Sequence, residues 1–184
     1  MSESHRRNKD PIAVKKALIN AAVHLALEGG ILAITTQAVC KRAGVSKGAL
    51  THHYLNKQAL LSSVFDSLIA LFETELFKVL SDDDVTDVAF TKAYVETCFK
   101  TLEDEHYRPI AALSTLLIGD EDCRQQWKTW LEGMLNQYQV TDQSLQCQLA
   151  RYTADGVWYN RLIGNGPTDV HTLKEKILHS LLSI

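Results

Sequence analysis

Residues Thr35–Lys57, TTQAVCKRAGVSKGALTHHYLNK, concentrate side chains that can bind a polyanion. They include four Lys or Arg residues, two adjacent histidines and several hydroxyl groups. Basic side chains contact phosphate oxygens, and polar side chains on an exposed helix can reach base edges in the major groove. Gly44, in the middle of the segment, can adopt the positive φ of a sharp turn. We therefore expect this segment to recognise nucleic acid by non-covalent contacts.

Charge is distributed unevenly along the 184-residue chain. Residues 1–57 contain nine Lys and Arg against three Asp and Glu, whereas the remaining residues contain ten against nineteen. The net charge of −3 therefore hides a basic N-terminal part followed by an acidic body. A polyanion partner is expected for the first part only, with chance variation of charge along the chain as the alternative.

The rest of the sequence offers little for metal binding or catalysis. Cys40, Cys98, Cys123 and Cys147 are scattered, without the paired spacing of a zinc site or a disulfide framework. We find no Gly-rich phosphate loop and no nucleophile elbow. We therefore expect no metal, no cofactor and no catalytic residue.

A helical enzyme remains a remote alternative. Its acid–base groups would be Asp155 beside Gly156, or His106 beside the run Glu103–Glu105. Adjacent acids on a helix point in different directions, so the cluster around His106 is more typical of a solvated helix end.

The N-terminus is polar and basic, and no apolar run approaches the roughly 20 residues that span a bilayer. We expect no membrane association and a cytoplasmic location, with reduced thiols.

Helical patterns follow one another along the chain, which predicts an all-α fold. Residues 1–10 are expected to form an arm, and Asp10-Pro11 begins a first helix that ends at Gly29-Gly30. The acidic run 81–87 predicts a loop between domains. The later helices are expected at about 87–104, from Pro109 to Gly119, from Asp120 to Tyr138, from Asp142 to Ile163, and after a cap at Thr168.

The basic segment has the pattern of a helix-turn-helix at about residues 35–54. Thr35, Ser46 and Asn56 are suited to cap the second, third and fourth helices, the last continuing to about residue 79. The core of the motif is expected to contain Val39, Val45 and Leu50, while the small residues Cys40 and Ala43 let the two helices approach closely. Lys47, Thr51 and His52 are left on the outer face.

The stretch AGVSKGALTHHYLNKQALL closely resembles the signature of the TetR (tetracycline repressor) family, and ADGVWYNRLIG resembles the eighth helix of many of its members. The resemblance implies an all-α homodimer with a three-helix helix-turn-helix head at residues 11–57. A helical body at residues 80–184 would bind a ligand and dimerise. Ligand binding would usually release a double-stranded DNA operator, which implies a repressor.

The resemblance also implies roles for individual residues. At Thr51 the family usually has tyrosine, so this chain lacks a long side chain that contacts phosphate there. His53 has an alternative role in packing beneath its helix. The implied DNA-contacting residues are Thr36, Gln37, Lys47, Gly48, Ala49, Thr51, His52, His53 and Lys57.

Aromatic residues are frequent in the second part of the chain, and helical bundles bind ligands in mostly apolar cavities between helices. We expect a small apolar or aromatic effector, although aromatic stripes at helical spacing are usually core. A DNA-binding regulator without an effector is the alternative. The candidate ligand-binding residues are Tyr94, Cys98, His106, Trp127, Trp130 and Asp155. The family dimerises through its last two helices, and the candidate dimer residues are Trp158, Leu162, Leu173, Ile177 and Leu181.

Overall fold

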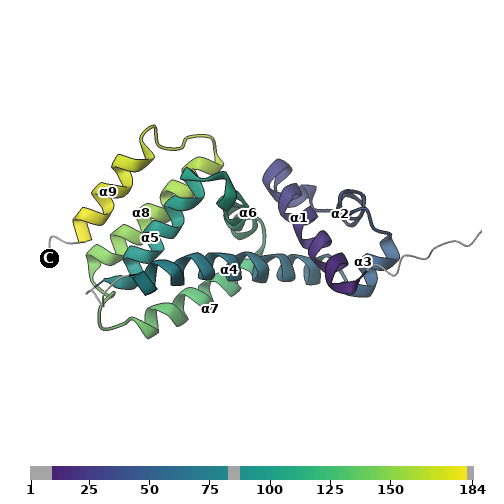
Figure 1. Cartoon of the computed structure of the whole chain (residues 1–184), viewed down its shortest axis with the longest axis horizontal. Coiled ribbons are helices and arrows are strands. Elements are labelled where there is room, and N and C mark those ends of the chain that lie inside the picture. Colours follow the sequence, from purple (N-terminus) through teal and green to yellow (C-terminus); the bar gives the residue numbers. More distant parts are fainter. Residues whose placement is uncertain (1–9, 83–87, 182–184) are drawn as a thin grey trace, which may run out of the picture. The chain divides into compact units, whose positions relative to one another are not determined.

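Figure 1 shows the computed structural model, which describes residues 10–82 and 88–181. Within these ranges it contains helices and no strand, confirming the predicted all-α class. The expected arm at residues 1–9 and the centre of the acidic segment, residues 83–87, lie outside the described residues. The elements are α1 (Pro11–Ala33), α2 (Thr36–Ala43), α3 (Lys47–His53), α4 (Lys57–Asp82), α5 (Ala89–Glu103), the 3-10 helix η1 (Glu105–Ala111), α6 (Ala112–Gly119), α7 (Glu121–Gln137), α8 (Leu145–Leu162) and α9 (Val170–Leu181).

The chain divides into two compact units, Met1–Val64 and Phe65–Ile184. Helix α4 begins in the first unit and ends in the second, so it is the element that they share.

Local capping sets the helix boundaries of the first unit. The side chains of Asp10, Thr35, Ser46 and Asn56 accept hydrogen bonds from backbone N–H groups in the first turns of α1, α2, α3 and α4, at 2.8–3.1 Å. Each such cap contributes about 1 kcal/mol. Gly44, at φ 63°, ends α2 in the left-handed conformation that the sharp turn requires. The predicted helix-turn-helix caps are therefore confirmed.

The core of the first unit joins α1, α2 and α3. Leu18, Val39 and Leu50, from these three helices, are almost completely buried. Val45, which was expected to join them, is only half-buried because it lies in the turn after α2. Tyr54 is also buried, and its hydroxyl lies 3.2 Å from the Ser63 hydroxyl in the first part of α4.

Helix α1 is interrupted near its end. Gly29 and Gly30 have non-helical backbone angles, and Gly30 has a φ of 70°, but a further turn follows as far as Ala33. The predicted break is thus present, although the helix does not stop there. Contrary to the sequence expectation, α1 is long and apolar enough to cross a membrane. Its apolar side chains instead pack against α2 and α3, as in the core helix of a globular domain.

In the second unit, helix α5 packs against both α8 and α9 (Figure 1). Phe90, Tyr94, Cys98 and Phe99 of α5 are fully buried. Each large apolar side chain contributes roughly 1.5–3 kcal/mol when it is removed from water, so α5 is the main source of core in this unit.

The N-terminus of α5 is capped from a distant part of the chain. The Asp142 carboxylate is completely buried, and Oδ1 accepts a hydrogen bond from the Thr91 N–H at 2.6 Å. The buried Arg151 guanidinium donates to the Thr91 hydroxyl and to the Asp142 carbonyl. Asp142 therefore belongs to the cap of α5, and α8 starts at Leu145 with Ser144 as its own cap, rather than at Asp142 as expected.

Two other predicted helix starts were wrong by a few residues. Pro109 lies inside η1, and α6 begins only at Ala112, because the tighter 3-10 turn accommodates the segment after Asp104. The Thr172 N–H donates to the Asp169 carboxylate at 2.9 Å, so Asp169 rather than Thr168 caps α9.

Candidate functional site

The first turn of α3 presents a small polar surface. Lys47 and Gly48 are exposed and Ala49 is half-buried, while Leu50 on the opposite face anchors the helix in the core. Thr51 and His52 are also exposed, one turn further on. The structure thus brings six of the nine predicted DNA-contacting residues together on this short helix, of which His53 is the last.

Gly48 has no packing reason to be glycine. A Cβ placed on it would meet only the Ser46 hydroxyl, at an ordinary contact distance of 3.8 Å. The neighbouring Thr51 hydroxyl is occupied within the helix, because it donates to the Gly48 carbonyl at 3.1 Å. The smooth surface at Gly48 therefore leaves the backbone of α3 open to close approach by a partner.

The other three predicted contacts lie at helix starts. Thr36 and Gln37 form the first turn of α2, and Gln37 is exposed. Lys57 is the exposed first residue of α4, and its Nζ lies 3.5 Å from the Ile31 carbonyl. Helix starts present unpaired N–H groups, which suit phosphate oxygens.

His53 differs from its neighbours. It is half-buried, and together with His52 it lines a groove of about 490 Å³ beside the first residues of α1. Its ring also lies 6.4 Å from that of the buried Tyr54. His53 therefore contributes to the packing of the motif, which was the alternative role considered for it.

In the second unit, Phe72 of α4 is the centre of an aromatic cluster. Its ring centroid lies 5.6–5.8 Å from those of Tyr94, Trp127, Trp130 and Trp158, all in edge-to-face geometry. Such pairs add about 0.5–1.5 kcal/mol each to the burial of the rings. The Phe72 ring of α4 thus contacts aromatic side chains from α5, α7 and α8.

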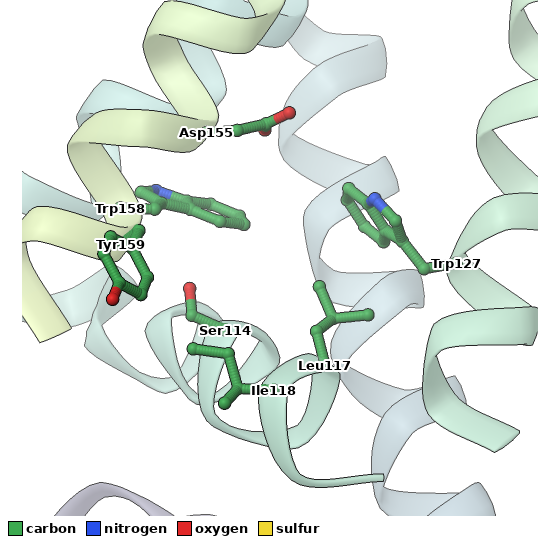
Figure 2. Close-up of a pocket in the computed structure, with 7 residues that line it drawn as sticks. All are labelled: Ser114, Leu117, Ile118, Trp127, Asp155, Trp158 and Tyr159. Carbon is green, nitrogen blue, oxygen red and sulfur yellow. The ribbon is translucent and has the colours of Figure 1, made fainter. Parts of the chain in front are cut away.

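A cavity of about 240 Å³ lies next to this cluster, between α6, α7 and α8 (Figure 2). Figure 2 shows Trp127 and Trp158 on opposite sides of the cavity, with Asp155 above and α6 below. The Trp158 indole is held in place because its N–H donates to the Cys98 carbonyl and the Thr101 hydroxyl, both at 3.0 Å. The lining residues are Ser114, Leu117, Ile118, Trp127, Asp155, Trp158 and Tyr159.

Asp155 is the acidic residue that lines this cavity, and it is hydrogen-bonded to the buried Tyr94. The Tyr94 hydroxyl donates to Asp155 Oδ1 at 2.6 Å. Burial, and then the charge of Asp155, raise the pKa of Tyr94 well above its ordinary value, so the phenol remains a donor. Burial also raises the pKa of Asp155, against the opposing effects of Tyr94 and the Arg151 guanidinium.

The structure places the predicted ligand-binding residues in three different environments. Trp127 and Asp155 line the cavity. Tyr94 and Cys98 are fully buried behind it, and Trp130 stacks on the outer side of Trp127 with its N–H bonded to Glu73. His106 is corrected: it lies exposed in η1 against Tyr107 and does not line the cavity.

Sequence reasoning missed four lining residues and gave Trp158 a different role. Ser114, Leu117 and Ile118 recur at helical spacing on α6, and Asp155, Trp158 and Tyr159 do so on α8. Such i, i+3, i+4 sets share one helix face, so a search for faces that combine aromatic and polar residues would have found the set on α8, whereas the set on α6 contains no aromatic residue.

Two family models match the chain. Residues 18–64 match the model described as "Bacterial regulatory proteins, tetR family". Residues 88–184, more than half of the chain, match "Tetracyclin repressor-like, C-terminal domain". The chain belongs to the TetR family. It is a DNA-binding transcriptional regulator of this family, and the predicted resemblance is confirmed.

Relatives of this TetR-family chain include the HTH-type transcriptional regulator UidR of Escherichia coli (strain K12). The two are 34% identical over 47 residues, which is 26% of this chain and only 24% of UidR. FadR from Bacillus subtilis, solved in complex with stearoyl-CoA, is 22% identical with a TM-score of 0.64, over 91% of this chain and 97% of that one. The multidrug binding protein EbrR, complexed with malachite green, is 17% identical with a TM-score of 0.69, over 90% and 96%. These two structures share the fold.

The predicted dimer residues of this TetR-family chain divide into two groups. Trp158, Ile177 and Leu181 are at most 7% exposed within the single chain. They are therefore corrected, because side chains already covered by α5 and its neighbours cannot face a second copy. Leu173 is half-buried, and Leu162 is exposed.

A different apolar surface on α8 is open to solvent. Leu145, Leu149, Tyr152, Tyr159 and Ile163 are each at least 50% exposed. Their spacing places them along one face of α8 and its C-cap, with Gly156 between them in open space. We call this row the α8 stripe.

Proposed function

We propose that this TetR-family regulator is a cytoplasmic repressor that binds a palindromic operator as a homodimer and releases it when a small molecule fills the cavity. In this proposal residues 11–57 form the DNA-binding domain and residues 80–184 the ligand-binding and dimerisation domain. The observation that carries it is the contact of two cavity-lining rings, Trp127 and Trp158, with Phe72 of α4, the helix shared by both units.

The proposed DNA contacts divide into base reading and positioning. Lys47, Gly48 and Ala49, in the first turn of α3, are proposed to approach base edges in the major groove, which the bare backbone at Gly48 favours. Thr36, Gln37 and Lys57 lie at helix starts and are proposed to contact phosphates. Thr51 and the two histidines complete the surface, with His53 in a packing role as well.

Two lysine substitutions test this division. Lys47→Ala should lower affinity for the operator about 10- to 100-fold while leaving affinity for random DNA nearly unchanged, because it removes a base contact. Lys57→Ala should weaken binding to both DNAs and reduce the salt-dependence slope by about one, because it removes a phosphate contact. Fluorescence anisotropy with labelled duplexes measures both quantities, once footprinting of the DNA flanking the gene has located the operator.

The matched control is Lys128→Ala, an exposed lysine on α7 that should change neither affinity. Equal loss of operator and random affinity in Lys47→Ala would show that the lysine does not read bases.

The α8 stripe is our proposal for the dimer contact. Large apolar side chains in a continuous exposed row are uncommon in monomers and are typical of subunit interfaces. A two-fold axis near Gly156 would let α8 of one protomer pack closely against α8 of its partner, because glycine permits a short distance between backbones. Leu162 flanks the stripe and remains a candidate contact.

The proposed release mechanism uses the aromatic cluster. A ligand that pushes Trp127 away from the fixed Trp158 displaces one of the four rings that hold Phe72, and thereby favours a different position of α4. In a dimer, a change in α4 alters the spacing of the two α3 helices, which must lie about 34 Å apart, or a multiple of it, to read successive major grooves. Typical coupling of about 1–3 kcal/mol corresponds to a 5- to 150-fold loss of operator affinity.

We expect a compound that binds the cavity to change the tryptophan fluorescence and to lower operator affinity. Trp127→Ala should leave operator affinity nearly intact but reduce the response to such a compound at least about fivefold, because the link from ligand to Phe72 is lost. Trp127→Phe, which keeps an aromatic ring at this position, should retain most of the response. The measurement is operator anisotropy during titration with compounds chosen by thermal-shift screening. Unchanged operator affinity at saturating ligand would contradict the release mechanism and favour a regulator without an effector.

A further inference from the structure

The polar groups of the cavity have a strong bias in charge. Of its seven lining residues, Asp155 alone is ionisable near neutral pH, and it is an acid. Ser114 and Tyr159 contribute hydroxyl groups, and the other lining side chains are aromatic or aliphatic. No lysine, arginine or histidine lines the cavity to attract an anion.

The charge of Asp155 is only partly offset within the described part of the chain. Its carboxylate has no ion pair there within 4.0 Å, and its hydrogen bond from Tyr94 comes from a neutral donor. The buried Arg151 guanidinium, on the same helix, lowers the pKa of Asp155 through its charge, but it donates its hydrogen bonds to the Thr91 hydroxyl and the Asp142 carbonyl. The Asp155 carboxylate thus loses hydration while Arg151 offsets its charge without forming an ion pair with it, and a positively charged ligand would relieve the remaining cost of burial.

The aromatic walls favour the same kind of ligand. Trp127 and Trp158 face the cavity from opposite sides, with Asp155 above them in the view of Figure 2. The negative faces of aromatic rings attract cations, and tryptophan does so most strongly. Trp158 is held rigidly by its two hydrogen bonds, so one wall of the cavity is fixed before a ligand arrives.

We propose that this cavity selects a small aromatic monocation, such as an aryl ammonium compound, whose positive charge faces Asp155 and whose apolar part lies between Trp127 and Trp158. The proposal rests on the proposed function, since it names the class of effector for the same cavity. It excludes anionic ligands, because their charge would meet the carboxylate in a site that has no cation to receive them.

A pair of isosteric probes tests the preference for charge. Phenyltrimethylammonium and tert-butylbenzene have nearly the same shape and differ in the positive charge. Equilibrium dialysis of the full-length protein should show the cation binding at least about tenfold more tightly, which is the size of one desolvated cation–π contact or more. Benzoate, an aromatic anion of similar size, should bind more weakly than either probe.

The Asp155→Asn variant tests whether the Asp155 carboxylate causes the preference of the cavity for a cation. The amide oxygen can still accept the Tyr94 hydrogen bond, so the fold is preserved while the charge is lost. This variant should reduce the affinity for phenyltrimethylammonium at least about tenfold and leave that for tert-butylbenzene unchanged. Asp122→Asn, at an exposed position in the first turn of α7, is the matched control and should bind both probes like the unmodified protein.

The pH dependence gives a second readout, because a quaternary ammonium has no proton to lose. Burial raises the pKa of Asp155, and a bound cation favours its ionised form. The affinity should therefore be full above the pKa of Asp155 and fall as the pH drops through it. Tyr94, Cys98 and Arg151 also face this carboxylate, but the pKa values of Tyr94 and Cys98 are raised well above their ordinary values, so neither titrates in the acidic range.

Equal affinity of the protein for the two isosteres, an unchanged preference in Asp155→Asn, or no binding of phenyltrimethylammonium at millimolar concentration would each overturn the proposal. If only the proposed function is wrong, the experiments give a different set of results. In that case the cation binds with the expected preference and the expected loss in Asp155→Asn, which supports the cation site, while operator affinity does not change.

Discussion

Replacing Leu149 and Tyr152 together by aspartate should convert the proposed dimer to a monomer and lower operator affinity at least about a hundredfold. Both side chains lie in the α8 stripe and are 50% and 63% exposed in the single chain. The substitutions should therefore leave the fold of the protomer intact while placing four carboxylates in the proposed interface. Separate recognition helices lose the second half-site, and linked binding of two sites is worth about 10²- to 10⁴-fold.

Analytical ultracentrifugation measures the oligomeric state, and anisotropy with the operator measures the loss of affinity. Val140→Asp is the matched control, since Val140 is 94% exposed but lies in the turn before α8, away from the stripe. It should sediment and bind DNA like the unmodified protein. A dimer that persists in the Leu149→Asp/Tyr152→Asp protein would place the interface elsewhere on the molecule.

Asp142→Ala is expected to lower the free energy of unfolding by about 2–3 kcal/mol, because it leaves the buried N–H of Thr91 without its acceptor. The same carboxylate also accepts the Thr141 hydroxyl at 2.8 Å, so the substitution removes two hydrogen bonds at once. Since α5 packs against both α8 and α9, the loss should destabilise the whole second unit. Urea denaturation followed by circular dichroism measures it.

Asp169→Ala provides a comparison at the start of α9. Asp169 caps its helix in the same way, through the Thr172 N–H, but on the surface, where water can replace the lost acceptor. Its substitution should therefore cost much less than that of Asp142. Similar losses in the two variants would mean that the burial and long-range position of Asp142 add nothing to its role.

Local sequence signals predicted the helix-turn-helix well, because its caps and turn depend on neighbouring residues. Thr35, Ser46 and Asn56 each cap the helix that follows them directly, and Gly44 takes the positive φ that its turn demands. The second unit was harder. Asp142 has the residue type and the position of a local cap for α8. Its carboxylate instead accepts a hydrogen bond from the N–H of Thr91 in α5, 51 residues earlier in the chain.

The functional residues of the second unit were predicted only in part for a similar reason. An apolar stripe shows which face of a helix is covered, but not whether its own chain or a second copy covers it. Ile177 and Leu181 of α9 were therefore assigned to the dimer, although packing of α9 on α5 and α8 buries them within the chain. Trp127 and Asp155 were found because an aromatic ring and a carboxylate are uncommon in an apolar face, whereas Leu117 and Ile118 resemble any core residue.

Tyr159 belongs to two surfaces at once: it lines the cavity, and it is part of the α8 stripe. If the stripe is the dimer contact, ligand occupancy and subunit association share this side chain, and the two equilibria are thermodynamically linked. The dissociation constant of the effector would then depend on protein concentration, differing between dilute monomers and concentrated dimers. In a cell with few copies of the regulator, the inducer threshold would be set by gene dosage as well as by the chemistry of the cavity.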